Sequence, residues 1–220
     1  MSQSLCIKPT VFVVDDDQQM RDSLVALLEV LDFRVQAFSG PAGFLRSYRP
    51  EMPGCLLLDV RMPRQSGIEL SEQLLSEGKR LPVIFITAHA DVTMAVAAMK
   101  TGAIEFLEKP FDRETLVDRL RKALELDAQW RRREAEFAQL RDRVAQLNDR
   151  QRETLELIRA GETNKAIAAK LLITERAVEM RRSSIMRKLQ VRSLAELLDL
   201  TATHRVLDDL RKAGEQRPAD

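Results

Sequence analysis

Cysteine and long apolar runs are scarce in this chain of 220 residues, which has only Cys6 and Cys55. Two cysteines cannot build the disulfide framework of a small secreted domain, and Cys55 lies in an apolar run that predicts a buried, reduced thiol. No stretch approaches the roughly 18 apolar residues of a membrane span, and the opening MSQSLCIKPT holds no apolar signal core. We therefore expect a soluble, cytoplasmic protein that has no contact with a membrane.

Charge of either sign is not in excess, since the net charge is +1, but its distribution along the chain is uneven. Lys and Arg against Asp and Glu number 11 and 15 over residues 1–112, 9 and 7 over 113–148, and 15 and 12 over 149–220. Within 163–195 there are 8 basic residues against 2 acidic ones. Such a concentration favours a polyanion as partner, with a solvated surface as the alternative. The length and the 45% apolar content suit two domains.

Short apolar segments alternate with helix-period segments in the first half of the chain. The predicted strands are 10–14, 33–38, 55–60, 82–87 and 103–108. This alternation predicts an α/β fold with a doubly wound, five-stranded parallel sheet, in which functional groups collect at the carboxyl ends of the strands.

Polar residues follow these strands at their carboxyl ends. Asp15, Asp16 and Asp17 end the first strand, Asp59 the third and Thr87 the fourth, and Lys109 follows the fifth. Each has a structural explanation taken singly, such as a helix cap, a turn cap, strand filler or a surface charge. Unrelated caps would have no reason to occur at the ends of several strands. We therefore predict that these residues line a single pocket.

The segments VVDDD, LLLDVRMPRQSGIEL, VIFITAHAD and AIEFLEKPF resemble the flavodoxin-like receiver domain of bacterial two-component response regulators. The resemblance implies that Asp59 accepts a phosphoryl group, while Asp15, Asp16, Asp59 and the backbone oxygen of Arg61 hold Mg²⁺. Carboxylate oxygens are the hard ligands that Mg²⁺ prefers, which explains the crowded carboxylates. We interpret Asp17 as a first-turn acid that the helix dipole favours. The predicted receiver covers residues 1–125.

The resemblance also implies how the pocket acts. Thr87 and Lys109 would bind the phosphoryl oxygens, the Lys109–Pro110 bond would be cis, and Phe106 would be an aromatic switch residue. For Phe106 the alternative is an ordinary core residue. The phosphoryl group would be slowly hydrolysed, so Asp59 is a stoichiometric acceptor and the protein is not an enzyme. The surface that would respond is a helix expected at 91–101, the fifth strand and the helix that follows it.

Proline and glycine are absent between residues 111 and 160, which predicts a long helix over 113–148 that overlaps the last receiver helix. An apolar seam at steps of three and four suggests a linker coiled coil; its members are Leu126, Trp130, Arg133, Phe137, Leu140, Val144 and Leu147. Arg133 would make the pairing marginal. The alternative is a single amphipathic helix that folds back on one of the domains.

The third segment is helical and basic, with helices expected near 149–160, 164–171, 175–189 and 193–202. Gly161 would close the first and Thr174 would cap the third, with Ile167, Leu171, Val178, Ile185 and Leu189 facing inward. NKAIAAKLLITERAV and SSIMRKLQVRS resemble the LuxR-type helix-turn-helix domain of NarL/FixJ response regulators, with a sigma-factor-like domain as a distant alternative. The domain would span 149–210, followed by a disordered tail at 211–220. The predicted DNA-contacting residues are Lys165, Arg176, Glu179, Met180, Arg182, Ser183, Arg187 and Lys188.

The chain departs from that family at three positions of the recognition helix. Glu179 replaces the usual Lys, Arg181 the usual His and Ser184 the usual Asn. Glu179 either accepts a hydrogen bond from a cytosine amino group or pairs with Arg176 or Arg182 within the helix.

Together the two resemblances imply a transcriptional regulator that phosphorylation activates. Its partners would be a sensor histidine kinase, promoter DNA, RNA polymerase and, after phosphorylation, a second copy of the chain. A phosphate-independent regulator is one alternative. The other is an aspartate phosphatase of the haloacid dehalogenase type, because Asp15 and Asp17 fit a D-x-D pattern. That pattern also calls for Thr or Val where Gln19 stands, and for a later acidic pair at a strand end.

Overall fold

A computed structural model describes residues 8–88, 96 and 98–202 of the chain. The chain divides into two compact units, Met1–Arg131 and Arg132–Asp220. Among the described residues, no helix has both the length and the apolar character that a membrane span requires. Cys6 and the segment 203–220, with the predicted tail, lie outside the described residues.

The first unit contains a five-stranded sheet in which all neighbouring strands are parallel. The strands are β1 (Thr10–Val14), β2 (Arg34–Phe38), β3 (Gly54–Asp59), β4 (Val83–Thr87) and β5 (Glu105–Glu108), in the order β2-β1-β3-β4-β5. The predicted fold class is thus confirmed. β5 begins two residues later than predicted because its ladder with β4 starts only at the pair Ile84 and Glu105. The strand order reverses between β1 and β3, which makes their carboxyl ends the expected place for a ligand site.

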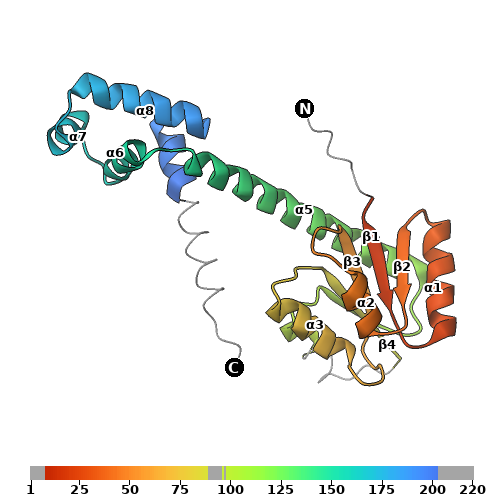
Figure 1. Cartoon of the computed structure of the whole chain (residues 1–220). Helices are drawn as coiled ribbons and strands as arrows, with labels where there is room; N and C mark the ends of the chain where they lie inside the picture. Colours follow the sequence, from red (N-terminus) through yellow and green to blue (C-terminus); the bar gives the residue numbers. More distant parts are fainter. Residues whose placement is uncertain (1–7, 89–95, 97, 203–220) are drawn as a thin grey trace. The chain divides into compact units, whose positions relative to one another are not determined.

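Apolar side chains cover both faces of the sheet because parallel strands alternate between two cores. On one face Val13, Leu57 and Ile86 belong to a cluster with α1 (Gln18–Val30) and the start of α5 (Arg113–Ala145). On the other, Phe12 and Leu56 pack with α2 (Pro41–Ser47) and α3 (Gly67–Ser76), which lie in front of the sheet in Figure 1. Of the helix expected at 91–101, residues 96 and 98–100 are helical, residue 101 lies in a turn, and the rest lie outside the described residues.

Helix α5 is 33 residues long and ends three residues earlier than predicted. The amides of Gln146 and Leu147 bond back to Arg143 and Val144, and Asn148 then caps the next helix, so the chain cannot stay helical to 148. Two residues of the predicted apolar seam also pack inside the chain's own second unit. Leu147 belongs to the core of the second unit and Val144 packs against it. This part of the seam is unavailable to a coiled coil, and the structure favours the folded-back alternative there.

The second unit is a small helical domain made of α6 (Asp149–Arg159), α7 (Asn164–Leu171), α8 (Glu175–Leu189) and a helical segment at 194–202. Gly161 closes α6 with a left-handed backbone, and the Thr174 hydroxyl accepts from the Ala177 amide as N-cap of α8, as predicted. The predicted inward residues form the core: Ile167, Val178, Ile185 and Leu189 are fully buried and Leu171 packs against them. The turn between α7 and α8 has helix-turn-helix geometry.

Candidate functional site: an acidic pocket and a basic helix

The predicted polar residues of the first unit meet at the carboxyl edge of the sheet. Asp15 directly follows β1, Asp59 and Thr87 end β3 and β4, and Lys109 directly follows β5. Asp15 and Thr87 are each 1% exposed and Asp59 is 6% exposed. The buried strands thus hold two carboxylates and a hydroxyl in one pocket, with a lysine across it.

Lys109 bridges the two buried carboxylates. Its Nζ lies 2.8 Å from Asp15 Oδ2 and 3.0 Å from Asp59 Oδ1. Burial raises the pKa of Asp59, and the charge of Asp15 raises it further, although Lys109 opposes both. Burial alone would lower the pKa of Lys109, but its hydrogen bonds to Asp15 and Asp59 outweigh burial and raise it. The pocket therefore keeps a cation next to two crowded acids.

The second oxygen of each carboxylate accepts from a backbone amide. The Asp17 amide donates to Asp15 Oδ1 at 2.9 Å, and the Arg61 amide donates to Asp59 Oδ2 at 2.8 Å. The Lys109–Pro110 bond is cis, as predicted. The two backbone amides and Lys109 thus orient both carboxylates.

Asp16 and Asp17 differ from Asp15 in their surroundings. Asp17 is the N-cap of α1, since its Oδ1 accepts from the amides of Gln19 and Met20 at 2.8 and 3.3 Å. Asp17 was predicted in the first turn of this helix, but it lies one residue before it, because the helix starts at Gln18. Asp16 is exposed, and within the described residues its carboxylate has no hydrogen bond or ion pair.

Sequence reasoning missed Arg21, whose Nη1 donates to the backbone oxygen of Asp15 at 2.8 Å. The only available signal was a basic residue in α1, six positions after the acidic strand end. It also missed Gly67, where a side chain would meet the backbone oxygen of Asp59. Phe106 is partly buried against the core on the α3 side of the sheet.

The donor set of the pocket fits Mg²⁺. In the described part of the chain, no group of three His, Cys, Asp or Glu side chains forms a ready metal cage. Mg²⁺ needs no such cage, because it keeps several waters and takes one or two carboxylates. The exposed carboxylate of Asp16 and the buried ones of Asp15 and Asp59 could supply these oxygens.

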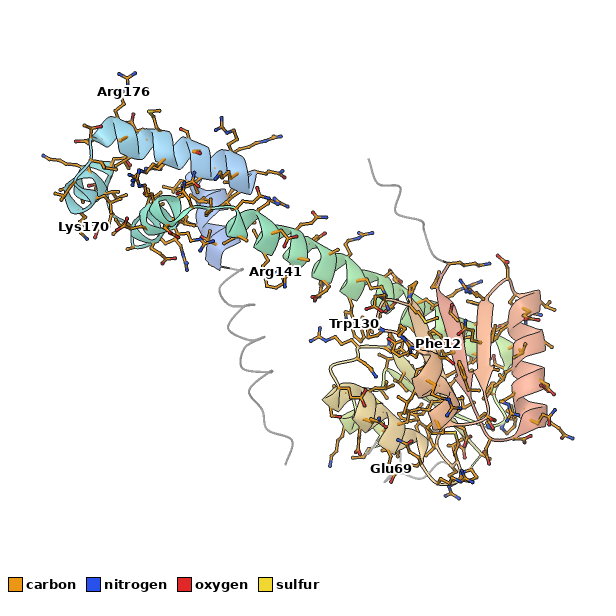
Figure 2. All side chains as sticks on the ribbon, viewed as in Figure 1. Phe12, Glu69, Trp130, Arg141, Lys170 and Arg176 are labelled. Atoms are coloured by element: carbon orange, nitrogen blue, oxygen red, sulfur yellow. The ribbon has the colours of Figure 1, made fainter. Side chains whose placement is uncertain are left out.

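The exposed side of α8 is formed by residues predicted to reach DNA. Arg176, Glu179, Met180, Ser183 and Arg187 are all exposed at helical spacing. Arg176 points away from the domain into solvent in Figure 2, and Met180 is 68% exposed. Lys165 on α7 is also exposed. The five residues of α8 form an exposed stripe along the helix that follows the turn.

Four other residues of α8 are engaged within the domain. Arg182 donates to Asn164 Oδ1 at 2.7 Å, and Lys188 donates to Gln146 O and Gln151 Oε1 at 2.9 and 2.8 Å. Both are predicted to contact DNA, and in the structure they also make hydrogen bonds within the domain. Arg181 and Ser184 bond to Thr154 and Gln151 of α6. Two of the three departures from the family pattern therefore face inward, and only Glu179 lies on the exposed stripe.

Comparison with known proteins gives these two sites a family. Residues 11–121 match the response regulator receiver domain, and residues 145–201 match the bacterial regulatory proteins of the luxR family. The chain belongs to the response regulators of the NarL/FixJ type. The receiver match covers the acidic pocket and the luxR match covers the exposed stripe of α8.

Related response regulators match over most of the chain. FixJ of Azorhizobium caulinodans is 42% identical over 188 residues, which is 86% of this chain and 89% of that protein. TodT of Pseudomonas putida is 37% identical over 191 residues, 87% of this chain and 84% of TodT. The solved structure of the response regulator StyR is 47% identical, with a TM-score of 0.81 over 89% of this chain and 99% of StyR. Receiver domains generally bind Mg²⁺ at the phosphorylation site, and a response regulator implies a sensor kinase and promoter DNA as partners.

Proposed function

We propose that Asp59 of this response regulator accepts a phosphoryl group from a sensor histidine kinase, and that phosphorylation activates DNA binding through α8. The observation that carries the proposal is the position of Asp59. Its carboxylate ends the central strand β3, with Lys109 Nζ at 3.0 Å and the Arg61 amide at 2.8 Å. A nucleophile so placed has a cation beside one carboxylate oxygen and a backbone donor on the other, and the cation can neutralise charge on the incoming phosphoryl group.

The residues of the pocket divide the work of phosphoryl transfer. Asp15, Asp16, Asp59 and the backbone oxygen of Arg61 would hold Mg²⁺, which supplies positive charge to the phosphoryl oxygens. Lys109 would shift from the Asp59 carboxylate to a phosphoryl oxygen, and its hydrogen bond to Asp15 keeps it in reach. Thr87, buried at the end of β4, would offer its hydroxyl to another oxygen. The protein thus mainly positions the reacting groups and neutralises the charge of the phosphoryl group.

The new charge would act on a two-state element. A phosphoryl group adds about −1.5 to −2 charge and three acceptor oxygens, which can draw Thr87 inward and let Phe106 move with it. We assign no turnover to the pocket, since the acceptor is modified stoichiometrically and hydrolysed slowly. The Asp17 carboxylate caps α1. This supports a stoichiometric acceptor over a D-x-D phosphatase, which needs the second carboxylate of the pattern in catalysis. A turnover assay with a generic phosphate ester separates the two.

Activation would act on DNA binding through dimerisation. Two copies of the helix-turn-helix domain would read paired half-sites, with α8 in the major groove. Lys165, Arg176 and Arg187 would attract phosphates, while Arg182 and Lys188 would contribute with the N–H donors that their bonds to Asn164, Gln146 and Gln151 leave over. We propose the bacterial cytoplasm as location and RNA polymerase as a further partner at the promoter.

The proposal is tested by measuring mass in sedimentation and binding to a random DNA panel, with and without beryllofluoride and Mg²⁺. We expect a monomer without the phosphoryl mimic, because Arg133 interrupts the seam and Val144 and Leu147 are used within the chain. With it we expect a dimer that binds DNA more tightly. Full dimerisation at nanomolar concentration in the absence of beryllofluoride would contradict phosphorylation-gated assembly.

Glu179 is expected to determine part of the DNA sequence preference. In the described residues its carboxylate has no ion pair, and Arg182, one of its two possible intrahelical partners, bonds to Asn164 instead. A free carboxylate in the major groove can accept from a cytosine amino group. Glu179→Lys should therefore bind random DNA more tightly but lose about 1–3 kcal/mol of discrimination at one base pair.

The control for Glu179 is Glu153→Lys, which makes the same charge change at an exposed position of α6. Measured over a full panel of single-base variants of the site, this control should keep the discrimination of the original protein. If Glu179→Lys also keeps it at every position, Glu179 is only a surface charge.

A further inference from the structure

Asp127 is a buried carboxylate of the receiver that takes no part in the acidic pocket. It lies on α5 and is 2% exposed. Its Oδ2 accepts from the Gly54 amide at 2.9 Å and from Arg131 Nε at 2.8 Å. Gly54 begins β3 and Asp59 ends it, so the two carboxylates occupy opposite ends of one strand, roughly 16 Å apart.

Arg131 completes a polar cluster at this end of the sheet. Its Nη1 donates to Pro50 O at 2.9 Å and its Nη2 donates to Met52 O at 2.6 Å. The guanidinium therefore joins α5 to the loop that leads into β3. A planar group with fixed donors suits three acceptors at once, which a lysine could not match.

The side of the cluster toward the core is closed by Tyr48. Its ring stacks on Phe44 and meets Phe12 edge-on, and its hydroxyl is buried with no hydrogen-bond partner among the described residues. Burial raises the pKa of Tyr48 to about 12, while Arg131 acts in the opposite direction. Asp127 and Arg131 are thus partly shielded from water. Charged hydrogen bonds are stronger in such surroundings, and losing them costs more stability.

The cluster lies at the point of α5 where the receiver unit ends. The buried apolar contacts of the helix with the sheet end at Ala123, with Leu124 packing against them. The receiver unit nevertheless extends to Arg131, and residues 132–136 are exposed. Two turns of helix are therefore held to the receiver mainly by polar contacts rather than by an apolar core.

We propose that Asp127 and Arg131 form a clasp that couples the linker helix to β3, so that the state of Asp59 at the far end of the strand affects DNA binding. This rests on the proposed function of Asp59. β3 pairs with β1 from Gly54 to Leu58 and with β4 from Leu56 to Asp59, and a strand held by these two overlapping ladders moves as a unit. A small displacement of β3 on phosphorylation then reaches α5 at Gly54. Without the clasp, the free linker begins near Leu124 and the displacement is lost.

The clasp is tested in the full-length protein with Asp127→Asn, Arg131→Met and the double variant. Each single variant leaves one charge without its partner, whereas the double variant removes both charges and should keep the fold. The matched control is Asp118→Asn, which breaks an i,i+4 ion pair with Lys122 on the exposed side of the same helix. Hydrogen exchange at Gly54 and 127–131, and acrylamide quenching of Trp130, the single tryptophan, report on the clasp (Figure 2).

In the clasp variants we expect exchange at Gly54 to rise by roughly tenfold or more. The gain in DNA affinity on adding beryllofluoride and Mg²⁺ should fall by roughly fivefold or more, with labelling of Asp59 unchanged. The control should keep the original values. A gain in affinity that stays unchanged in the double variant overturns the coupling, whatever happens to exchange.

If the proposed function is wrong, the experiment gives a different set of results. If the original protein shows no gain with beryllofluoride, the proposed activation is wrong, and exchange at Gly54 alone then decides the clasp. Unchanged exchange in all three variants would show that α5 is held by other contacts and overturn the clasp itself.

Discussion

Replacing Asp59 with asparagine is expected to abolish acid-labile labelling of the protein by acetyl phosphate in the presence of Mg²⁺. Asp59 ends the central strand, and its carboxylate lies beside Lys109 and the Arg61 amide. Asparagine keeps the size of the side chain but lacks the anionic oxygen that attacks phosphorus. Asp15, the other buried carboxylate of the pocket, is held by Lys109 and the Asp17 amide on both oxygens. No second acceptor should take over.

The control for this experiment is Asp17→Asn. Asparagine is as good an N-cap as aspartate, so α1 should start as before while one carboxylate next to the pocket disappears. Labelling should persist in this variant. Undiminished labelling of Asp59→Asn would place the phosphoryl group elsewhere.

The same variant has an expected effect on stability. Because burial and Asp15 raise the pKa of Asp59, the ionised carboxyl destabilises the native state at neutral pH. Asp59→Asn should therefore unfold at higher denaturant than the original protein above that pKa. The difference should shrink as the pH falls through the pKa of native Asp59, since the original carboxyl then becomes neutral. Urea unfolding at several pH values, without metal, measures this.

Gly67→Ala is expected to damage both the fold and the phosphorylation site. Gly67 is the first residue of α3, and a Cβ there would lie 2.2 Å from the backbone oxygen of Asp59 and 3.0 Å from the Leu58 side chain. The nearest atom is backbone, so it cannot rotate away. We expect a loss of about 1–3 kcal/mol in unfolding free energy. The labelling rate should fall by roughly 100-fold, because displacement of Asp59 by even about 1 Å misaligns the nucleophile.

Gly43→Ala, at another glycine of the same domain, is expected to leave the fold and the phosphorylation site intact. Gly43 lies inside α2, where a Cβ would meet Phe38 at an ordinary contact distance of 3.6 Å. Alanine is the better helix former by about 1 kcal/mol, so this variant should be slightly more stable and labelled normally. Equal behaviour of the two variants would show that the close approach at Gly67 relaxes without cost.

Most of the acidic pocket could be predicted from the sequence because its parts lie at strand ends. Five short apolar segments separated by helical ones permit few topologies, and parallel strands bring their carboxyl ends to one edge. The sequence therefore predicts that Asp15, Asp59, Thr87 and Lys109 lie together. The same holds for α8, where the inward positions of Val178, Ile185 and Leu189 follow from helical spacing alone.

Other features depend on contacts between residues distant in the sequence. The seam of α5 has the same spacing whether its partner is a second helix or its own domain, and only the packing of Val144 and Leu147 distinguishes them. Arg182 and Lys188 look like phosphate ligands in the sequence, but their direction is set by Asn164, Gln146 and Gln151.

The sequence by itself determined the two domains, the sheet, the pocket at its edge and the exposed stripe of α8, since each follows from the period of apolar residues along the chain. Only the tertiary structure decided that Arg181 and Ser184 face α6, that Gly67 approaches Asp59, and that Asp127 bonds to Gly54. The physical reason is that spacing along the chain indicates only the partners within a side chain's own helix or strand, and none on other elements. The partner of a polar side chain on another element is whichever donor or acceptor the folded chain brings within about 3 Å while water is excluded.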